Sequence, residues 1–459
     1  MLFSSVIFLY YFLPLLLIVY FIVPSKYKNL VLLLFSLLFY FLGEPKYIII
    51  LILSCVLNYF FSKLIDKTKY KKLFLVMAVI YNVGQLLFFK YTDFFIDNIN
   101  HIFNTKIPFM YIVMPIGISF FTFQALGYVI DVYNKKHEPA TNLLDFMTYV
   151  CLFPQLVAGP IVRYSDIKEE LQNRKTSYSK FSLGIKRFVI GLSKKVLIAN
   201  VLGEFASVCV ENTVLASWLR AIAYTLQIYF DFSGYSDMAI GLGSMFGFTF
   251  PENFKYPLTA TSITDFWRRW HITLSSWFRD YVYIPLGGNR VNKIKWIRNI
   301  FVVWFLTGFW HGASWNFIIW GLYFGIILVI EKLFLKKHLD KTKILKHIYS
   351  LLIIIVSFVI FNSPSMPLAI KEIKNMFFLN SIPFIGKETI YYLRSNLVLF
   401  IIAIIGSTPL ISKLIEKLKK MKVLKVCNIL EPIVYVGLLI LCTAFLIDSS
   451  FNPFLYFRF

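Results

Sequence analysis

The stretch "WFLTGFWHGASWNFIIWGLYFG", residues 304–325, indicates the fold class because it is almost continuously apolar and long enough to cross a membrane. A helix needs about 20 apolar residues to span the hydrocarbon core of a bilayer. One imidazole, His311, interrupts the stretch beside Trp310 and the small residues at 312–314. Such a side chain is costly in hydrocarbon unless it faces a partner or a cavity. His311 is therefore predicted either to pack against a neighbouring helix or to serve a site within the membrane.

The rest of the chain has the same character. Of its 459 residues, 58% are hydrophobic and 15% are charged, and the mean hydropathy is +0.69. This composition predicts an all-α integral membrane protein in a lipid bilayer, with about eleven transmembrane helices and some re-entrant or interfacial ones. The candidate spans lie near 2–23, 29–43, 46–65, 72–90, 111–133, 145–162, 183–203, 216–247, 298–333, 349–361, 396–411 and 432–448.

The net charge of +23 comes from 47 basic and 24 acidic residues. Cytoplasmic loops of membrane proteins accumulate lysine and arginine, and the chain carries no nucleic-acid-binding module, so no nucleic-acid partner is expected. The five cysteines lie in or beside apolar runs and form no C-x-x-C pair. Neither a disulfide framework nor a metal site is expected.

The loops predict the orientation of the chain. Basic loops such as "SKLIDKTKYKK" (62–72) alternate with charge-balanced ones, which puts the N-terminus outside. The basic segment "SKLIEKLKKMKVLK" (412–425) precedes one last span and the tail "FNPFLYFRF" (451–459). The tail is therefore also expected on the extracytoplasmic side of the membrane.

A polar segment, residues 249–298, separates the apolar blocks, and it contains "DFWRRWHITLSSWFRD" at 265–280. Taken as one helix, this sequence would put His271 on a face with Arg268 and Ser275. The adjacent face of the same helix would carry Trp267, Trp270, Leu274 and Trp277. The pattern predicts an interfacial helix. It is either an ordinary amphipathic helix or one that carries chemistry.

Two histidines and several arginines are candidates for that chemistry. A neutral imidazole at His271 or His311 can take a proton from a hydroxyl and later return it. Arg268, Arg269 and Arg279 could hold the phosphates of an acyl donor, although basic residues at a cytoplasmic face need no such role. The other four histidines lie in hydrophilic loops and are expected at the surface: His101, His137, His338 and His347.

The motifs "DFWRRWHITLSSWFRDYVYIPLGGNR" (265–290) and "FLTGFWHGASWNFIIWGLYFG" (305–325) resemble the membrane-bound O-acyltransferase family. The closest branch is the bacterial alginate O-acetyltransferase group, which includes peptidoglycan acetylation proteins. "MPIGISFFTFQ" (114–124) and "FPQLVAGPIVR" (153–163) resemble the same branch, so the resemblance covers nearly the whole chain. It implies a single domain, 1–459: N-terminal helices (1–110), a catalytic core (111–333), C-terminal helices (334–450) and an extracytoplasmic tail (451–459).

The resemblance also implies a function. The family fold is a ring of tilted helices around a funnel, with His311 and His271 at the positions of the family's two histidines. The acyl donor would be acetyl-CoA, a substrate and not a bound cofactor, with Arg268, Arg269, Arg279, Trp267 and Trp310 as donor-binding candidates. The acetyl group would pass through the membrane to a cell-envelope polysaccharide such as alginate or peptidoglycan. A separate partner with an SGNH-hydrolase-like domain would complete the transfer.

Several alternatives remain open. Within the family, the alternative is the D-alanyl transferase of teichoic-acid modification, although "YIPLGGNR" (283–290) favours acetylation. Outside the family's chemistry, the alternatives are a transporter of a small anion or lipid-linked sugar, and an inactive scaffold. One position departs from the pattern: Asn362, in "IFNSP", stands where members often carry arginine. The tail resembles an aromatic motif in which Tyr456 would carry the acyl group, and its other interpretation is an aromatic membrane anchor.

Overall fold

A computed structural model describes residues 1–420 and 424–448, and every regular element in those ranges is helical. Among these described residues, seven helices are long and apolar enough to cross a membrane: Ser25–Gly43, Ile48–Lys67, Lys71–Phe103, Trp315–Leu339, Leu345–Asn362, Lys387–Gly406 and Leu430–Asp448. Two shorter apolar helices are Phe8–Ile22 and Ile118–Tyr133. The all-helical membrane fold is confirmed, while the expected number of about eleven spans stays a prediction.

The chain forms two compact units. The first consists of Met1–Phe188 and Met238–Pro251, and the second consists of Val189–Asp237 and the described residues from Glu252 onward. The first unit contains α1 (Leu13–Ile22), α2 (Lys28–Gly43), α3 (Ile48–Lys67), α4 (Lys71–Leu86), α5 (Thr92–Phe103), α6 (Ile118–Tyr133), α7 (Leu143–Cys151), α8 (Phe153–Leu156), α9 (Tyr164–Asn173) and most of α10 (Tyr178–Ser193). Short π-helical or 3₁₀ turns lie at Phe8–Phe12, Ser25–Tyr27 and Leu87–Tyr91.

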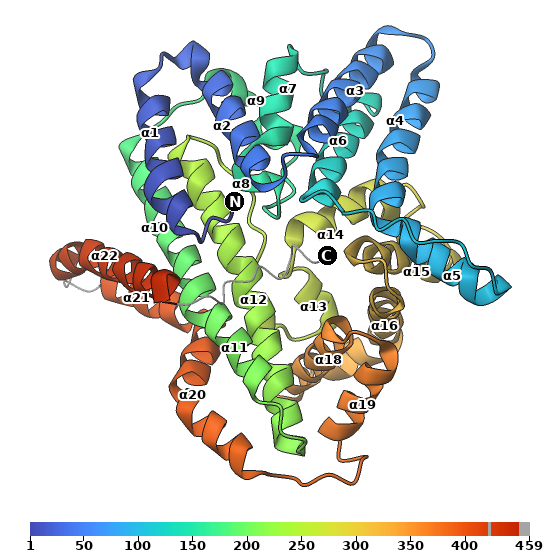
Figure 1. The fold of residues 1–459 in the computed structure, drawn as a ribbon, viewed down its shortest axis with the longest axis vertical. Helices are drawn as coiled ribbons and strands as arrows, with labels where there is room; N and C mark the ends of the chain where they lie inside the picture. The colour runs from blue at the N-terminus through green and yellow to red at the C-terminus, as the bar shows by residue number, and fades with distance from the viewer. Residues whose placement is uncertain (421–423, 449–459) are drawn as a thin grey trace. The chain divides into compact units, whose positions relative to one another are not determined.

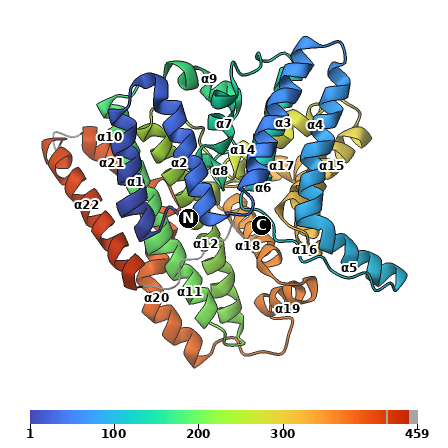
Figure 2. The ribbon, with the colours of Figure 1, turned by 45° about the horizontal axis from the view of Figure 1, so that its top comes forward.

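Within the first unit, α3 packs against α4, α6 and α7, and it lies beside α4 in both views (Figure 1 and Figure 2). Two buried amides join α3 to α4. Asn82 donates to Oδ1 of Asn58 at 2.7 Å, and Asn58 donates back to Oδ1 of Asn82 at 3.2 Å. Apolar faces alone give weak specificity between helices in lipid, so this reciprocal pair fixes how α3 and α4 meet.

The second unit contains α11 (Asn200–Val208), the first part of α12 (Val214–Met245), α13 (Ile263–Trp267), α14 (Ile272–Phe278), α15 (Lys293–His311), α16 (Trp315–Ile330), α17 (Lys336–Leu339), α18 (Leu345–Asn362), α19 (Met366–Met376), α20 (Lys387–Gly406), α21 (Leu410–Lys420) and α22 (Leu424–Asp448). Short turns of π-helix or 3₁₀-helix lie at Lys194–Ala199, Pro257–Thr259, Arg279–Tyr283 and Glu331–Leu335. α16 packs against α13, α15 and α18, and this group positions the site described below (Figure 1).

The candidate span 298–333 is a hairpin of two helices. α15 ends at His311, Gly312 and Ser314 have extended backbones, and α16 starts at Trp315. The two helices cross very closely at Gly308, where a Cβ atom would overlap the carbonyl oxygen of Phe317. A glycine at position 308 lets the two backbones approach this closely. The candidate span 298–333 is therefore two helices, because residues 312–314 interrupt the helix and reverse the chain.

The expected helix over 265–280 is also broken. α13 ends at Trp267 and α14 starts at Ile272, and His271 between them has the left-handed conformation, with φ 44° and ψ 54°. The stripe predicted for the membrane surface is instead buried: the four side chains Trp267, Trp270, Leu274 and Trp277 are all at most 8% exposed. The prediction of one continuous helix was wrong, because packing inside the second unit overrides the helical pattern of the local sequence, while the interfacial position of this segment stays a prediction.

Candidate functional site

The side chain of Asn253 fixes the position of His271. Asn253 lies before α13, and His271 lies after α13, directly before α14. Both side chains are fully buried, and Nδ1 of His271 lies 3.2 Å from Oδ1 of Asn253. The same oxygen accepts hydrogen bonds from the backbone N–H of Thr273, at 3.2 Å, and from the Thr273 hydroxyl, at 2.9 Å. The backbone carbonyl of Asn253 also accepts from the N–H of Ile272 at 3.0 Å. One asparagine therefore organises the whole turn into α14.

These contacts determine the tautomer of His271. A backbone N–H can only donate, so the Thr273 contact identifies the side-chain atom of Asn253 as its carbonyl oxygen. His271 must then donate through Nδ1–H, which leaves the lone pair on Nε2. His271 lies outside the seven candidate membrane helices, and burial lowers the pKa of its imidazole to about 3. The ring is thus neutral, with Nε2 as its basic atom.

A left-handed backbone is uncommon for a residue other than glycine and costs roughly 1–3 kcal/mol. At His271 the surrounding hydrogen bonds hold this conformation. It turns the imidazole away from the path of a continuous helix. The ring packs edge-on against Phe232, with centroids 4.7 Å apart, and it contacts Trp310 at 6.1 Å.

His311 is the last residue of α15 and is 3% exposed. Its imidazole is enclosed by aromatic rings: the centroids of Trp310, Trp320 and Phe361 lie 4.9, 5.0 and 5.3 Å away, each edge-to-face. The chain reversal after His311 puts this ring at a helix end, where side chains of α16 and α18 meet it. A histidine at a helix end inside a dry aromatic shell is suited to proton transfer without competition from bulk water.

Trp310 joins the two histidines, since its indole contacts both imidazoles. Trp267 extends the same aromatic cluster, with its ring 4.6 Å from Trp304 and 5.7 Å from Trp320. The structure therefore brings together four of the residues that the sequence singled out: His271, His311, Trp267 and Trp310.

The arginines behave differently. Nε of Arg269 lies 2.9 Å from Oδ1 of Asp265, and Nε of Arg279 lies 2.6 Å from Oδ1 of Asp280. Each of these two cations is thus partly neutralised by a carboxylate near it in sequence. Arg268 is exposed. A role for these three residues in holding a donor phosphate stays a prediction, as does that of Tyr456, which lies outside the described residues.

Sequence reasoning missed a carboxylate that supports the site. Glu331 is fully buried just after α16, where it accepts hydrogen bonds from the backbone N–H groups of Ile263 and Thr264, at 2.7 and 3.0 Å. The Thr264 hydroxyl also donates to it, at 2.5 Å. A carboxylate is favoured at a helix N-terminus, and here it anchors the start of α13. The available signal was an acidic residue inside the predicted apolar span 298–333.

Asn253 was missed as well, although it lies in the polar segment 249–298. Its partner His271 is eighteen residues away in number, and no local pattern connects the two. Among the described residues, 1–420 and 424–448, no group of three or more metal-ligating side chains is found.

Comparisons with known proteins give a consistent result. The model of the membrane-bound O-acyltransferase family matches residues 137–366. The probable alginate O-acetylase AlgI of Azotobacter vinelandii is 42% identical over 389 residues, which cover 82% of this chain and 78% of that protein. The peptidoglycan O-acetyltransferase of Helicobacter pylori is 38% identical over 83% of this chain and 81% of its own length. The teichoic acid D-alanyltransferase of Bacillus subtilis is 32% identical over 48% of this chain and 60% of its own length.

Proposed function

The chain belongs to the membrane-bound O-acyltransferase family and is an acyltransferase, and from this premise we propose that it acetylates a cell-envelope polysaccharide across the cytoplasmic membrane. The donor we propose is acetyl-CoA on the cytoplasmic side. The acceptor lies outside, and it is alginate, peptidoglycan or another exopolysaccharide. The observation that carries the proposal is the pair of buried histidines that both contact Trp310, in a chain 42% identical to an alginate O-acetylase.

In the proposed reaction, His311 removes the proton from an acceptor hydroxyl. The hydroxyl oxygen bonds to the thioester carbonyl carbon, the carbon–sulfur bond breaks, and the leaving thiolate takes the proton that His311 returns. His271, neutral because it is buried and held in one tautomer by Asn253, would orient the reacting groups through Nε2. Trp267 and Trp310 would exclude water from the thioester, and Arg268, Arg269 and Arg279 would contact its phosphates.

The first acceptor that we propose is the phenol of Tyr456. A phenol has a pKa of about 10, so it is a weak nucleophile until a base assists it, but its ester is a good acyl donor. The acetyl group would then pass to an extracytoplasmic partner with an SGNH-hydrolase-like domain. This route requires the tail on the outer face, which the alternation of basic and neutral loops supports.

D-alanyl transfer is a weaker second candidate. The B. subtilis D-alanyltransferase aligns over 239 residues, against 389 for the alginate O-acetylase and 425 for the peptidoglycan O-acetyltransferase. D-alanyl carries a methyl group and an ammonium group on the carbon next to the carbonyl, and acetyl carries neither, so a direct competition between acetyl-CoA and a D-alanyl carrier thioester would distinguish them.

The test is transfer from radiolabelled acetyl-CoA by the full chain in proteoliposomes that contain the partner and an acceptor glycan. We expect His311→Ala to lower the transfer rate by a factor of about 10² to 10⁴, because it removes the general base. The matched control is His338→Ala, which removes an exposed imidazole of the same unit. Equal transfer by the two variants would refute the proposal.

A further inference from the structure

The helix α21 joins two candidate membrane spans. α20 ends at Gly406, just before α21, and the span Leu430–Asp448 of α22 follows it. The 11 residues of α21 rise about 16 Å as an α-helix, which is too short to cross a hydrocarbon core of about 30 Å. α21 packs against both neighbours, and it lies beside α22 in both views (Figure 1 and Figure 2). It therefore stays on the side of the membrane where α20 ends and the next span begins.

Lysines indicate which side this is. The sequence over 412–425 carries six lysines and one glutamate, so the positive-inside rule puts this side in the cytoplasm. Anionic phospholipids give the cytoplasmic leaflet a negative surface potential, and this potential attracts lysine-rich segments next to a span. α21 therefore lies where a basic helix meets negative charge.

The apolar residues of α21 form one face. At about 100° per residue they fall within an arc of about 140° around the helix. None of them is covered by another helix of the unit: their side chains are between 36 and 60% exposed, and they are Leu410, Ile411, Leu414, Ile415 and Leu418. A contiguous exposed apolar face of this kind marks an interaction surface, since water covers it poorly.

The polar residues of α21 lie on the other side of the helix. Lys413, Glu416 and Lys417 are exposed there. Ser412, on the same side, contacts the body of the unit, because the hydroxyl of Tyr256 donates to its Oγ at 3.2 Å. Tyr256 belongs to the loop that carries Asn253. The polar edge of α21 is thus attached to the unit, and the apolar face is left open.

We infer that α21 is a docking surface for the anionic phospholipids of the cytoplasmic leaflet. The apolar side chains enter the boundary between headgroups and acyl chains, as in other amphipathic helices with a lysine-rich polar face. The ammonium groups of Lys413 and Lys417 pair with lipid phosphates, which their long side chains reach from beside the apolar face. Charge complementarity favours this partner over a second copy of the chain, because two copies of so lysine-rich a segment repel each other.

The first test measures the depth of α21 in the full chain, in nanodiscs of mixed phosphatidylcholine and phosphatidylglycerol. A nitroxide is attached at Leu414→Cys on the apolar face, or at Glu416→Cys on the polar face as the matched control. The four cysteines of the described ranges are buried, and the wild type treated in the same way gives the background signal. We expect oxygen, which concentrates in hydrocarbon, to relax the label at position 414, and a water-soluble nickel chelate to relax the label at position 416.

Two results of this test would overturn the inference. Access of the nickel chelate to the label at position 414 would put the apolar face in water. Protection of that label from both oxygen and the chelate would put the face against protein, as in a contact between two copies of the chain.

The second test measures the effect of lipid charge. Photoreactive analogues of phosphatidylglycerol and phosphatidylcholine are added in turn, and their covalent attachment to the α21 segment is quantified by mass spectrometry. We expect the phosphatidylglycerol analogue to label this segment more strongly. The double variant Lys413→Gln with Lys417→Gln should lower that preference by a factor of about five for each lysine lost. The matched control, Lys341→Gln with Lys343→Gln, removes two exposed lysines of the same unit and should leave it unchanged.

Equal labelling by the two lipids, or equal effects of the two double variants, would also overturn the inference. Neither measurement uses an acyl donor, a partner protein or an acceptor. Failure of the lipid tests therefore leaves the proposed reaction standing, and failure of the His311 test leaves the lipid surface standing.

Discussion

Replacing Asn253 by leucine, whose side chain has the same branching but no polar atoms, should disable the site. Oδ1 of Asn253 accepts three hydrogen bonds, from Nδ1 of His271 and from the backbone and hydroxyl of Thr273. At a net value of about 1 kcal/mol for each bond, their loss costs about 3 kcal/mol. The left-handed backbone of His271 stores roughly 1–3 kcal/mol, so the remaining contacts no longer hold it. A displacement of the imidazole by about 1 Å is enough to lower kcat about a hundredfold.

The assay combines thermal unfolding of the purified protein with kcat and KM for acetyl transfer in proteoliposomes. Thr273→Val is the matched control: it removes only the hydroxyl donor and should cost about 1 kcal/mol with a small change in kcat. Asn253→Asp keeps an acceptor oxygen but introduces a negative charge, which raises the pKa of His271 by stabilising the imidazolium. Because the neutral ring is the active form, the rise of activity with pH should then move to higher pH.

Two results would refute this reasoning. One is a folded Asn253→Leu variant with the wild-type kcat. The other is a pH–rate profile of Asn253→Asp that superimposes on that of the wild type, since a purely structural role predicts no shift of the profile.

Three further predictions address helix packing, the support of α13 and the tail. Gly308→Ala should lower the unfolding temperature, because the added Cβ would overlap the carbonyl oxygen of Phe317. The control Gly84→Ala adds a Cβ in open space and should leave the unfolding temperature unchanged or raise it. Equal effects of the two substitutions would contradict the close crossing of α15 and α16. Glu331→Gln should destabilise the protein by about 1–3 kcal/mol, as seen in denaturation, because an amide cannot accept from all three donors at α13. Tyr456→Phe should abolish transfer to the partner, measured with radiolabelled donor, while membrane insertion persists; normal transfer would leave the tail as an anchor.

The amino-acid sequence alone is enough to predict an integral membrane protein. A chain with many apolar stretches as long as 304–325 cannot bury all of them from water in a soluble fold. In lipid, a helix makes all the hydrogen bonds that its own backbone needs. The residue types at His271 and His311 also indicated the candidate chemistry, because an imidazole in such a segment is costly without a partner or a role. The long motifs at 265–290 and 305–325 indicated the family that the comparisons then showed.

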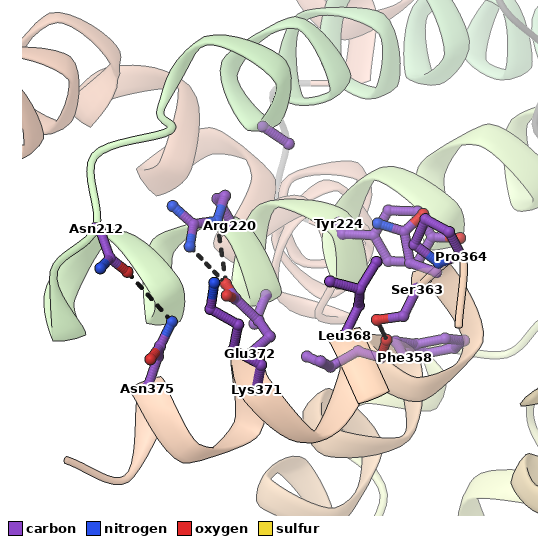
Figure 3. Close-up of a pocket in the computed structure, with 14 residues that line it drawn as sticks. Asn212, Arg220, Tyr224, Phe358, Ser363, Pro364, Leu368, Lys371, Glu372 and Asn375 are labelled. Atoms are coloured by element: carbon purple, nitrogen blue, oxygen red, sulfur yellow. Dashed lines mark hydrogen bonds and ion pairs between the residues drawn. The ribbon is translucent and has the colours of Figure 1, made fainter. Parts of the chain in front are cut away.

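How His271, His311 and their supporting residues come together is seen only in the tertiary structure. The spacing of apolar residues over 265–280 predicts one helix, yet the hydrogen bonds to Asn253 and the packing around His271 break it. Such tertiary contacts outweigh a local helix preference of a few tenths of a kcal/mol per residue. The supports at Asn253 and Glu331 are far in sequence from what they hold, so no periodicity could reveal them. No periodicity could reveal either that Lys371 and Asn362 line one pocket, because this pocket forms only where α12, α18 and α19 pack together (Figure 3). Local sequence specifies what a segment can form, but contacts between distant segments select which of those forms persists.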